Sequence, residues 1–114
     1  MQKIMIVDDE ALVLLDLTMT VEDLGYEVFC DCTDIETALS CLEKETPDAA
    51  LLDIDVGGTP VWPLARALQE CGCPFVFVSA DSGHKELRTE FAGAALVDKP
   101  ASTDELARAL QSIL

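Results

Sequence analysis

The sequence has little positive charge. It contains 7 Lys and Arg residues against 22 Asp and Glu residues, and its formal net charge is -15. Nucleic acids and anionic lipid surfaces bind proteins with basic patches, so this balance argues against either as a partner. We expect some of the acidic side chains to cluster, and clustered carboxylates attract a hard divalent cation.

Targeting and membrane-spanning segments are also missing. The first four residues lack the cationic region and apolar stretch of a signal peptide, and no apolar run reaches the length of a transmembrane helix. We therefore expect a cytoplasmic protein with no membrane contact. The five cysteines are odd in number and are expected to be reduced and largely buried.

Two Cys-x-Cys pairs, Cys30/Cys32 and Cys71/Cys73, contain the ligand type that a soft metal needs. Their spacing is not that of a zinc ribbon, and no histidine lies beside them, since His84 is the only histidine of the chain. The pattern favours ordinary buried thiols over a metal site.

The hydrophobic pattern predicts one domain, over residues 1–114, in which five strands alternate with five helices. At 114 residues and 50% apolar composition the chain can bury a sizeable core. Short apolar runs predict strands at 3–7, 26–30, 49–52, 75–79 and 94–97. Helices are expected at 10–24, after a Thr33 N-cap to about 44, through 64–70, at 84–91, and after a capping box at 102–105.

Alternating strands and helices form a parallel sheet with helices on both faces. The fold class is therefore α/β, a doubly wound five-stranded parallel sheet of (βα)5 type. The usual strand order for such a sheet is 2-1-3-4-5, and its ligand site lies where the first and third strands end. Asp8, Asp9 and Asp53 fall at this point.

Four predicted strands end in chemically useful groups: Asp8 and Asp9, Asp53 with Asp55 close behind, Ser79, and Lys99. Converging carboxylates repel one another, and a shared divalent cation removes that repulsion. Mg²⁺ suits a site of oxygen ligands and water. We expect Asp9 and Asp53 as direct ligands, Asp8 as a ligand or water-bridged partner, and Asp55 as a ligand through its main-chain carbonyl.

Such a site predicts metal-assisted phosphoryl transfer. Asp53 would attack phosphorus as a nucleophile, Lys99 would pair with the phosphoryl group, and Ser79 would donate a hydrogen bond to it. Each residue alone has an ordinary reading as a turn, cap or solvated side chain. Their presence together at four strand ends favours the functional interpretation.

Taken together, Val7-Asp8-Asp9-Glu10, Leu51-Leu52-Asp53, Ser79-Ala80 and Asp98-Lys99-Pro100 resemble the motifs of response-regulator receiver domains of two-component signalling. The resemblance covers the whole chain and implies a flavodoxin- or CheY-like fold. It implies that Asp53 accepts a phosphoryl group from a phosphohistidine on a sensor histidine kinase or a phosphotransfer protein, with Mg²⁺ on Asp8 and Asp9. It also implies a cis Lys99-Pro100 bond, and a phospho-acceptor with slow autodephosphorylation rather than a turnover enzyme.

The sequence departs from the family pattern at three positions. Gly57 stands where a proline is common, Leu96 replaces the usual aromatic switch residue, and Ala101 stands where a bulky aromatic is frequent. A pseudo-receiver that binds without being phosphorylated is therefore an alternative. A phosphatase of the haloacid-dehalogenase type is another, because Asp53-Ile54-Asp55 resembles its paired aspartates.

We expect no output domain, so the protein would signal through protein contacts or serve as a phosphate sink. The helix at 10–24 has apolar side chains on more than one side. Leu12, Leu15 and Met19 cannot all face the core together with the other leucines and valines of this helix. They are either a kinase-docking face or ordinary surface residues.

Overall fold

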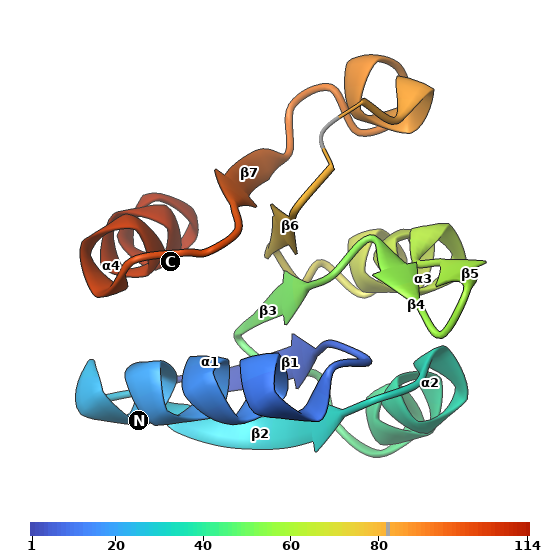
Figure 1. The fold of residues 1–114 in the computed structure, drawn as a ribbon. Coiled ribbons are helices and arrows are strands. Elements are labelled where there is room, and N and C mark those ends of the chain that lie inside the picture. The colour runs from blue at the N-terminus through green and yellow to red at the C-terminus, as the bar shows by residue number, and fades with distance from the viewer. Residues whose placement is uncertain (82) are drawn as a thin grey trace.

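Five parallel strands form the main sheet in the computed structural model, which describes residues 1–81 and 83–114. The strands are β1 (Lys3–Val7), β2 (Glu27–Cys32), β3 (Ala49–Leu52), β6 (Phe75–Ser79) and β7 (Ala95–Asp98). Their order is β2-β1-β3-β6-β7, and each neighbouring pair is parallel (Figure 1). Counted as five strands, this is the predicted 2-1-3-4-5 order, so the predicted fold class is confirmed.

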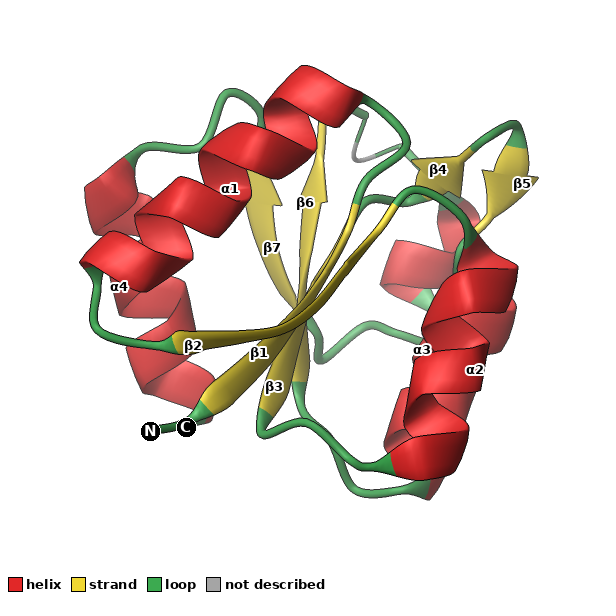
Figure 2. Ribbon diagram, turned by 90° about the horizontal axis from the view of Figure 1, so that it is seen from below, coloured by secondary structure: helices red, strands yellow, loops and turns green. Residues whose placement is uncertain are grey.

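Helices cover both faces of this sheet. They are α1 (Ala11–Asp23), α2 (Ile35–Lys44), α3 (Trp62–Glu70) and α4 (Thr103–Ile113). Helices α1 and α4 lie on one face, and α2 and α3 lie on the other (Figure 2). Within the described ranges, none of the helices has the length and apolar character needed to cross a membrane.

The sheet separates two apolar layers. In β1, Ile4 and Ile6 pack into the layer under α1 and α4, whereas Met5 and Val7 pack into the layer under α2 and α3. All four side chains have no exposed surface. This two-sided burial explains why the strands appear in the sequence as continuous apolar runs.

The helix predicted at 84–91 is wrong. The segment forms a short 3₁₀ helix, η1 (Lys85–Arg88), followed by turns. Phe91 is its buried side chain, and its ring stacks on Trp62 with the centroids 5.3 Å apart. A segment of eight residues with one buried anchor gains too little from packing to offset the cost of nucleating an α-helix.

Two further details differ from the predictions, the N-cap of α2 and the loop after Asp53, and one is confirmed. The N-cap of α2 is Asp34 rather than Thr33, because the Asp34 carboxylate accepts a hydrogen bond from the Thr37 N–H at 2.7 Å. The capping box at Ser102 and Glu105 is confirmed. The loop expected after Asp53 contains a small hairpin of β4 (Asp55–Val56) and β5 (Thr59–Pro60).

The turn of this hairpin explains the glycine pair. Gly57 and Gly58 have φ values of 61° and 80°. A two-residue hairpin turn of type I′ requires positive φ at both central positions, which glycine adopts without strain. The hairpin holds the Gly57 N–H close to the carboxyl ends of the sheet strands, where the candidate site lies.

Candidate functional site

The register of the sheet brings the polar strand ends to one level. Val7 of β1 pairs with Leu52 of β3, so Asp8 and Asp53 are the next residues on neighbouring strands. The Asp53 N–H donates to the Val7 carbonyl at 2.9 Å. On the other side, the Lys99 N–H donates to the Ser79 carbonyl at 3.0 Å. Sheet pairing therefore gathers Asp8, Asp53, Ser79 and Lys99 at the carboxyl edge.

Lys99 joins the two buried carboxylates. Its Nζ lies 2.8 Å from Asp8 Oδ2 and 3.4 Å from Asp53 Oδ2. Asp8 has no exposed surface and Asp53 is 8% exposed. Burial on its own would lower the pKa of Lys99, but the hydrogen bond to Asp8 and the charge of Asp53 outweigh it, so the lysine pKa is raised. The side chain is therefore a fixed cation between two acids.

Asp53 is held in an environment that disfavours its charge. Burial is the main cause, and the nearby Asp8 carboxylate adds repulsion. Lys99 and the hydrogen bond from the Ile54 N–H oppose these effects, but the pKa of Asp53 is still raised to about 6. The carboxylate is therefore ionised at neutral pH at a cost in free energy, which a bound cation would reduce.

The residues after β1 form an oxygen-rich cluster. Carboxylate oxygens of Asp8, Asp9 and Glu10 lie within 4.8 Å of one another. Asp8 Oδ1 accepts from the Glu10 N–H at 2.9 Å, and the buried Asp8 Oδ2 pairs with Lys99 Nζ at 2.8 Å. A donor set made only of carboxylate oxygens fits a hard divalent ion such as Mg²⁺. Glu10 was not predicted as a ligand, although it continues the acidic run after the strand.

The predicted metal ligands differ in how close they lie to this carboxylate cluster. Asp9 is exposed, and its Oδ2 accepts from the Gly57 N–H at 3.1 Å. Asp53 and Asp55 are outside the three-residue carboxylate cluster. However, Asp9, Asp53 and Asp55 line one pocket of about 220 Å³, together with Glu10, Ser79, Ala80, Asp81 and Lys99. The pocket is thus lined by every predicted site residue except Asp8, which is fully buried.

Ser79 is buried at this pocket, but its hydroxyl is engaged in its own turn. It accepts from the Asp81 N–H at 3.1 Å and donates to the Asp81 carbonyl at 3.0 Å. A hydrogen bond from Ser79 to a phosphoryl group would have to replace the bond to the Asp81 carbonyl. The cis peptide bond expected between Lys99 and Pro100 is present.

His84 is a site residue that the sequence did not reveal. Its Nε2 lies 3.5 Å from Asp55 Oδ2 and 3.8 Å from Asp81 Oδ2. The ring also packs against Trp62, with the centroids 5.8 Å apart. His84 is the N-cap residue of η1 and stands at the start of the segment that was predicted as a helix over 84–91. Asp55 begins β4 and Asp81 follows β6, and no sequence pattern predicted that these two segments approach His84.

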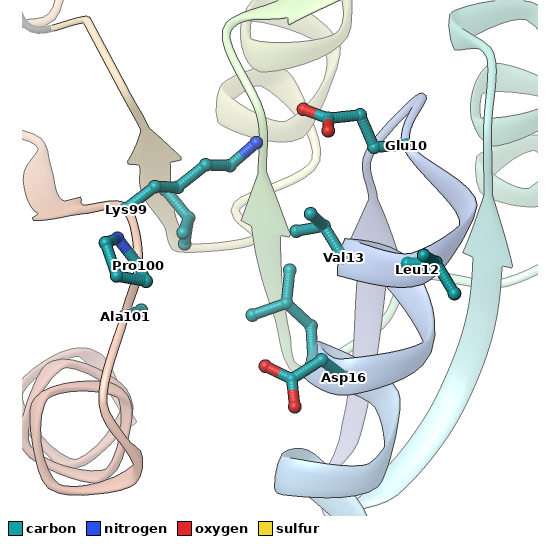
Figure 3. A pocket seen from close by; sticks show the side chains of 9 residues that line it. Glu10, Leu12, Val13, Asp16, Lys99, Pro100 and Ala101 are labelled. Carbon is teal, nitrogen blue, oxygen red and sulfur yellow. The ribbon is translucent and has the colours of Figure 1, made fainter.

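A second pocket, of about 390 Å³, borders the acidic site and is more apolar (Figure 3). Lys99 and Glu10 line both pockets. Figure 3 shows these two side chains reaching over the pocket from opposite sides, with Val13 of α1 below them. Leu12 of α1 lines this pocket and is 81% exposed, and Leu15 and Met19 of the same helix are exposed as well. An apolar surface therefore lies next to the polar site.

Comparison with known proteins agrees with this geometry. The family model for the response regulator receiver domain matches residues 4–111. The chain is similar to SdrG from Sphingomonas melonis Fr1, with 30% identity, coverage of 99% of this chain and 96% of that one, and a TM-score of 0.85. It is also similar to a response regulator receiver protein from Sinorhizobium medicae WSM419, with 25% identity, coverage of 98% and 93%, and a TM-score of 0.87.

A third similar structure is a CheY-like receiver domain protein from Methanospirillum hungatei JF-1, with 25% identity, coverage of 98% of this chain and 92% of that one, and a TM-score of 0.86. The match of the family model extends over nearly the whole chain and includes each strand end that forms the acidic site. The strand order, the converging acids and the lysine on the last strand all agree with that match. The chain belongs to the response regulator receiver domain family.

Proposed function

We propose that this receiver domain accepts a phosphoryl group on the Asp53 carboxylate, with Mg²⁺ bound beside it. The observation that carries the proposal is the contact of Lys99 Nζ with both buried acids, at 2.8 Å from Asp8 and 3.4 Å from Asp53. A nucleophile, a fixed cation and further carboxylates thereby meet at one pocket. The donor is a phosphohistidine on a sensor histidine kinase or a phosphotransfer protein, as in the family.

In the proposed reaction, an Asp53 oxygen forms a bond to phosphorus while the bond from phosphorus to the donor nitrogen breaks. The imidazole leaves with its electron pair and takes up a proton from solvent. Asp53, with a pKa of about 6, is mostly ionised at neutral pH and therefore nucleophilic. Mg²⁺ bound by Asp8, Asp9 and the neighbouring oxygens would neutralise charge on the phosphoryl oxygens.

Lys99 and Ser79 would hold the group after transfer. Lys99 is already desolvated and charged beside Asp53, so it can pair with a phosphoryl oxygen with little reorganisation. Ser79 lies at the pocket and would exchange its bond to the Asp81 carbonyl for one to the phosphoryl group. This exchange would move the turn after β6 and so signal the phosphorylated state to the surface.

The exposed apolar face of α1 is the surface that we propose for the phosphodonor. Leu12, Leu15 and Met19 are all more than half exposed, and α1 starts directly after the acidic cluster. A donor helix packed there would place its histidine next to the pocket. Phosphorylation would then alter contacts with a downstream protein, or the domain would act as a phosphate sink.

The test is a mass measurement. The purified protein is incubated with Mg²⁺ and acetyl phosphate, and the intact mass is recorded for the wild type, Asp53→Asn and the control Asp55→Asn. We expect one phosphoryl group on the wild type and on Asp55→Asn, and none on Asp53→Asn. No adduct on the wild type would support a pseudo-receiver, and repeated turnover of a phosphomonoester would support a phosphatase.

A further inference from the structure

Three thiols gather between the edge strand β2 and helix α2, outside the acidic pocket. They belong to Cys30 and Cys32 of β2 and to Cys41 of α2. The three sulfur atoms lie within 4.8 Å of one another, and the Cys30 and Cys32 sulfurs are 3.7 Å apart. All three are free thiols. The receiver chemistry makes no use of them.

A bulge in β2 creates this cluster. Ile4 pairs with Val28, but the next residue of β1, Met5, pairs with Cys30, so Phe29 is an extra residue in β2. Without the bulge, Cys30 would pair with Ile6 and face the α1 side of the sheet. A one-residue shift of register moves side chains to the opposite face. The bulge therefore places Cys30 and Cys32 on the face where Cys41 lies.

The spacing suits coordination of a metal. Three thiolates in a plane around one ion, with metal–sulfur bonds of about 2.3 Å, have their sulfurs about 4.0 Å apart, and Cys30 and Cys32 are already 3.7 Å apart. Cys41 reaches the same distance through a side-chain adjustment of about 1 Å, which its half-buried position permits. Cys30 is half-buried too, so an ion can enter from the surface, whereas Cys32 closes the inner side.

The ligand number selects the ion. Among the described residues, no histidine or carboxylate lies close enough to the three cysteines to be a fourth ligand. Zn²⁺ in a structural site takes four ligands in a tetrahedron. Cu⁺ is soft, is preferred by thiolates, and is stable with three sulfurs in a plane. A trigonal set of thiols therefore matches Cu⁺ better than Zn²⁺.

The local charge is consistent with a cation. The contact between the two thiols of β2 lowers the pKa of Cys32 and raises that of Cys30, so the pair loses its first proton more readily at Cys32. Asp31 and Asp34 act in the opposite direction, because their negative charges disfavour a bare thiolate at Cys32. The same two charges attract a positive ion to the site.

We propose that Cys30, Cys32 and Cys41 bind one Cu⁺ ion as three thiolates. Each coordinating thiol gives its proton to solvent, and neither the sulfur nor the copper changes oxidation state. The ion would join the edge strand to α2. Because the Asp8 N–H donates to the Cys32 carbonyl at 3.0 Å, this link would lie next to the strand end that carries the acidic cluster.

The test uses the reduced full chain without oxygen. Cu⁺ is supplied as its acetonitrile complex, the protein competes with a Cu⁺-specific chelator, and X-ray absorption counts the sulfur ligands. We expect one Cu⁺ per chain with three sulfur neighbours, and at least a tenfold loss of affinity in Cys41→Ser. Cys30→Ser is the second variant and should show the same loss, so the test does not depend on the folding of one variant.

The matched control is the double variant Cys71→Ser/Cys73→Ser, which removes the other Cys-x-Cys pair. Cys71 and Cys73 contact the Leu68 and Pro74 carbonyls, respectively, and do not belong to the three-thiol cluster. This variant should bind Cu⁺ like the wild type. The proposal is overturned if the wild type loses all Cu⁺ to the chelator, if Cys41→Ser binds as tightly as the wild type, or if Zn²⁺ displaces Cu⁺.

Discussion

Replacement of Asp53 by Asn should stabilise the protein at neutral pH. The folded protein raises the pKa of Asp53 from 3.8 to about 6. A carboxyl group whose pKa is higher in the folded than in the unfolded chain destabilises the folded state once it ionises. Each pKa unit corresponds to about 1.4 kcal/mol of unfolding free energy. The difference of roughly two units gives about 3 kcal/mol at pH 7.5. The neutral amide of Asn has a similar shape and removes this cost.

The sign and the pH window follow from the same linkage. Below pH 3.8 the carboxyl is protonated in both the folded and the unfolded chain, so the cost is absent there. The cost grows as the pH rises from 3.8 to 6 and is constant above that window. At pH 5 the gain in the Asn variant should therefore be about half of its value at pH 7.5, or roughly 1.6 kcal/mol.

Urea unfolding without Mg²⁺ at pH 7.5 and pH 5 measures both values. Asp98→Asn is the matched control, because it removes an exposed carboxylate from the end of β7, which β6 separates from β3. Its effect should stay within about 0.5 kcal/mol at both pH values. Unchanged or lower stability of Asp53→Asn at pH 7.5, or an equal gain at both pH values, would show that ionised Asp53 does not destabilise the folded protein.

Three further predictions concern the lysine, the metal and the core. Lys99→Met should cost about 3 kcal/mol in urea unfolding, because the fully buried Asp8 loses its cation; a cost under about 1 kcal/mol would contradict the ion pair. Mg²⁺ at ten times its Kd should raise the unfolding free energy by about 1.4 kcal/mol, and equal stabilisation of Asp9→Asn would argue against Asp9 as a ligand. Phe77→Ala should cost about 3–5 kcal/mol and shift the fluorescence of Trp62, whose ring centroid is 5.7 Å away; an unchanged emission would contradict this packing.

The sheet could be predicted because its strands are buried on both faces. The runs 49–52 and 75–78 are apolar throughout and stand out from their surroundings. Once the strands were placed, general rules for parallel sheets supplied the order and the edge where the acids meet. The segment 84–91 failed because its conformation depends on the packing of Phe91 against Trp62, which lies far away in sequence.

The sequence predicted the site residues that stand at strand ends, but not the contacts that loops add to the site. The pairing of β1 with β3 brings Asp8 and Asp53 together, as the topology requires. The turn bonds of Ser79 and the acidic neighbours of His84 depend on how loops fold over the edge. The thiol cluster depends on the bulge at Phe29, which breaks the register and has no signal in the sequence.

We propose that Asp53 becomes a phospho-acceptor only in the presence of a divalent ion held by its acidic neighbours. Borohydride reduces an acyl phosphate on aspartate to homoserine, so the modified residue can be located by peptide mass spectrometry after treatment with acetyl phosphate. We expect homoserine at position 53, formed with Mg²⁺ and absent when EDTA replaces it. Homoserine at position 8 or 9, or equal conversion of Asp53 without Mg²⁺, would contradict the account.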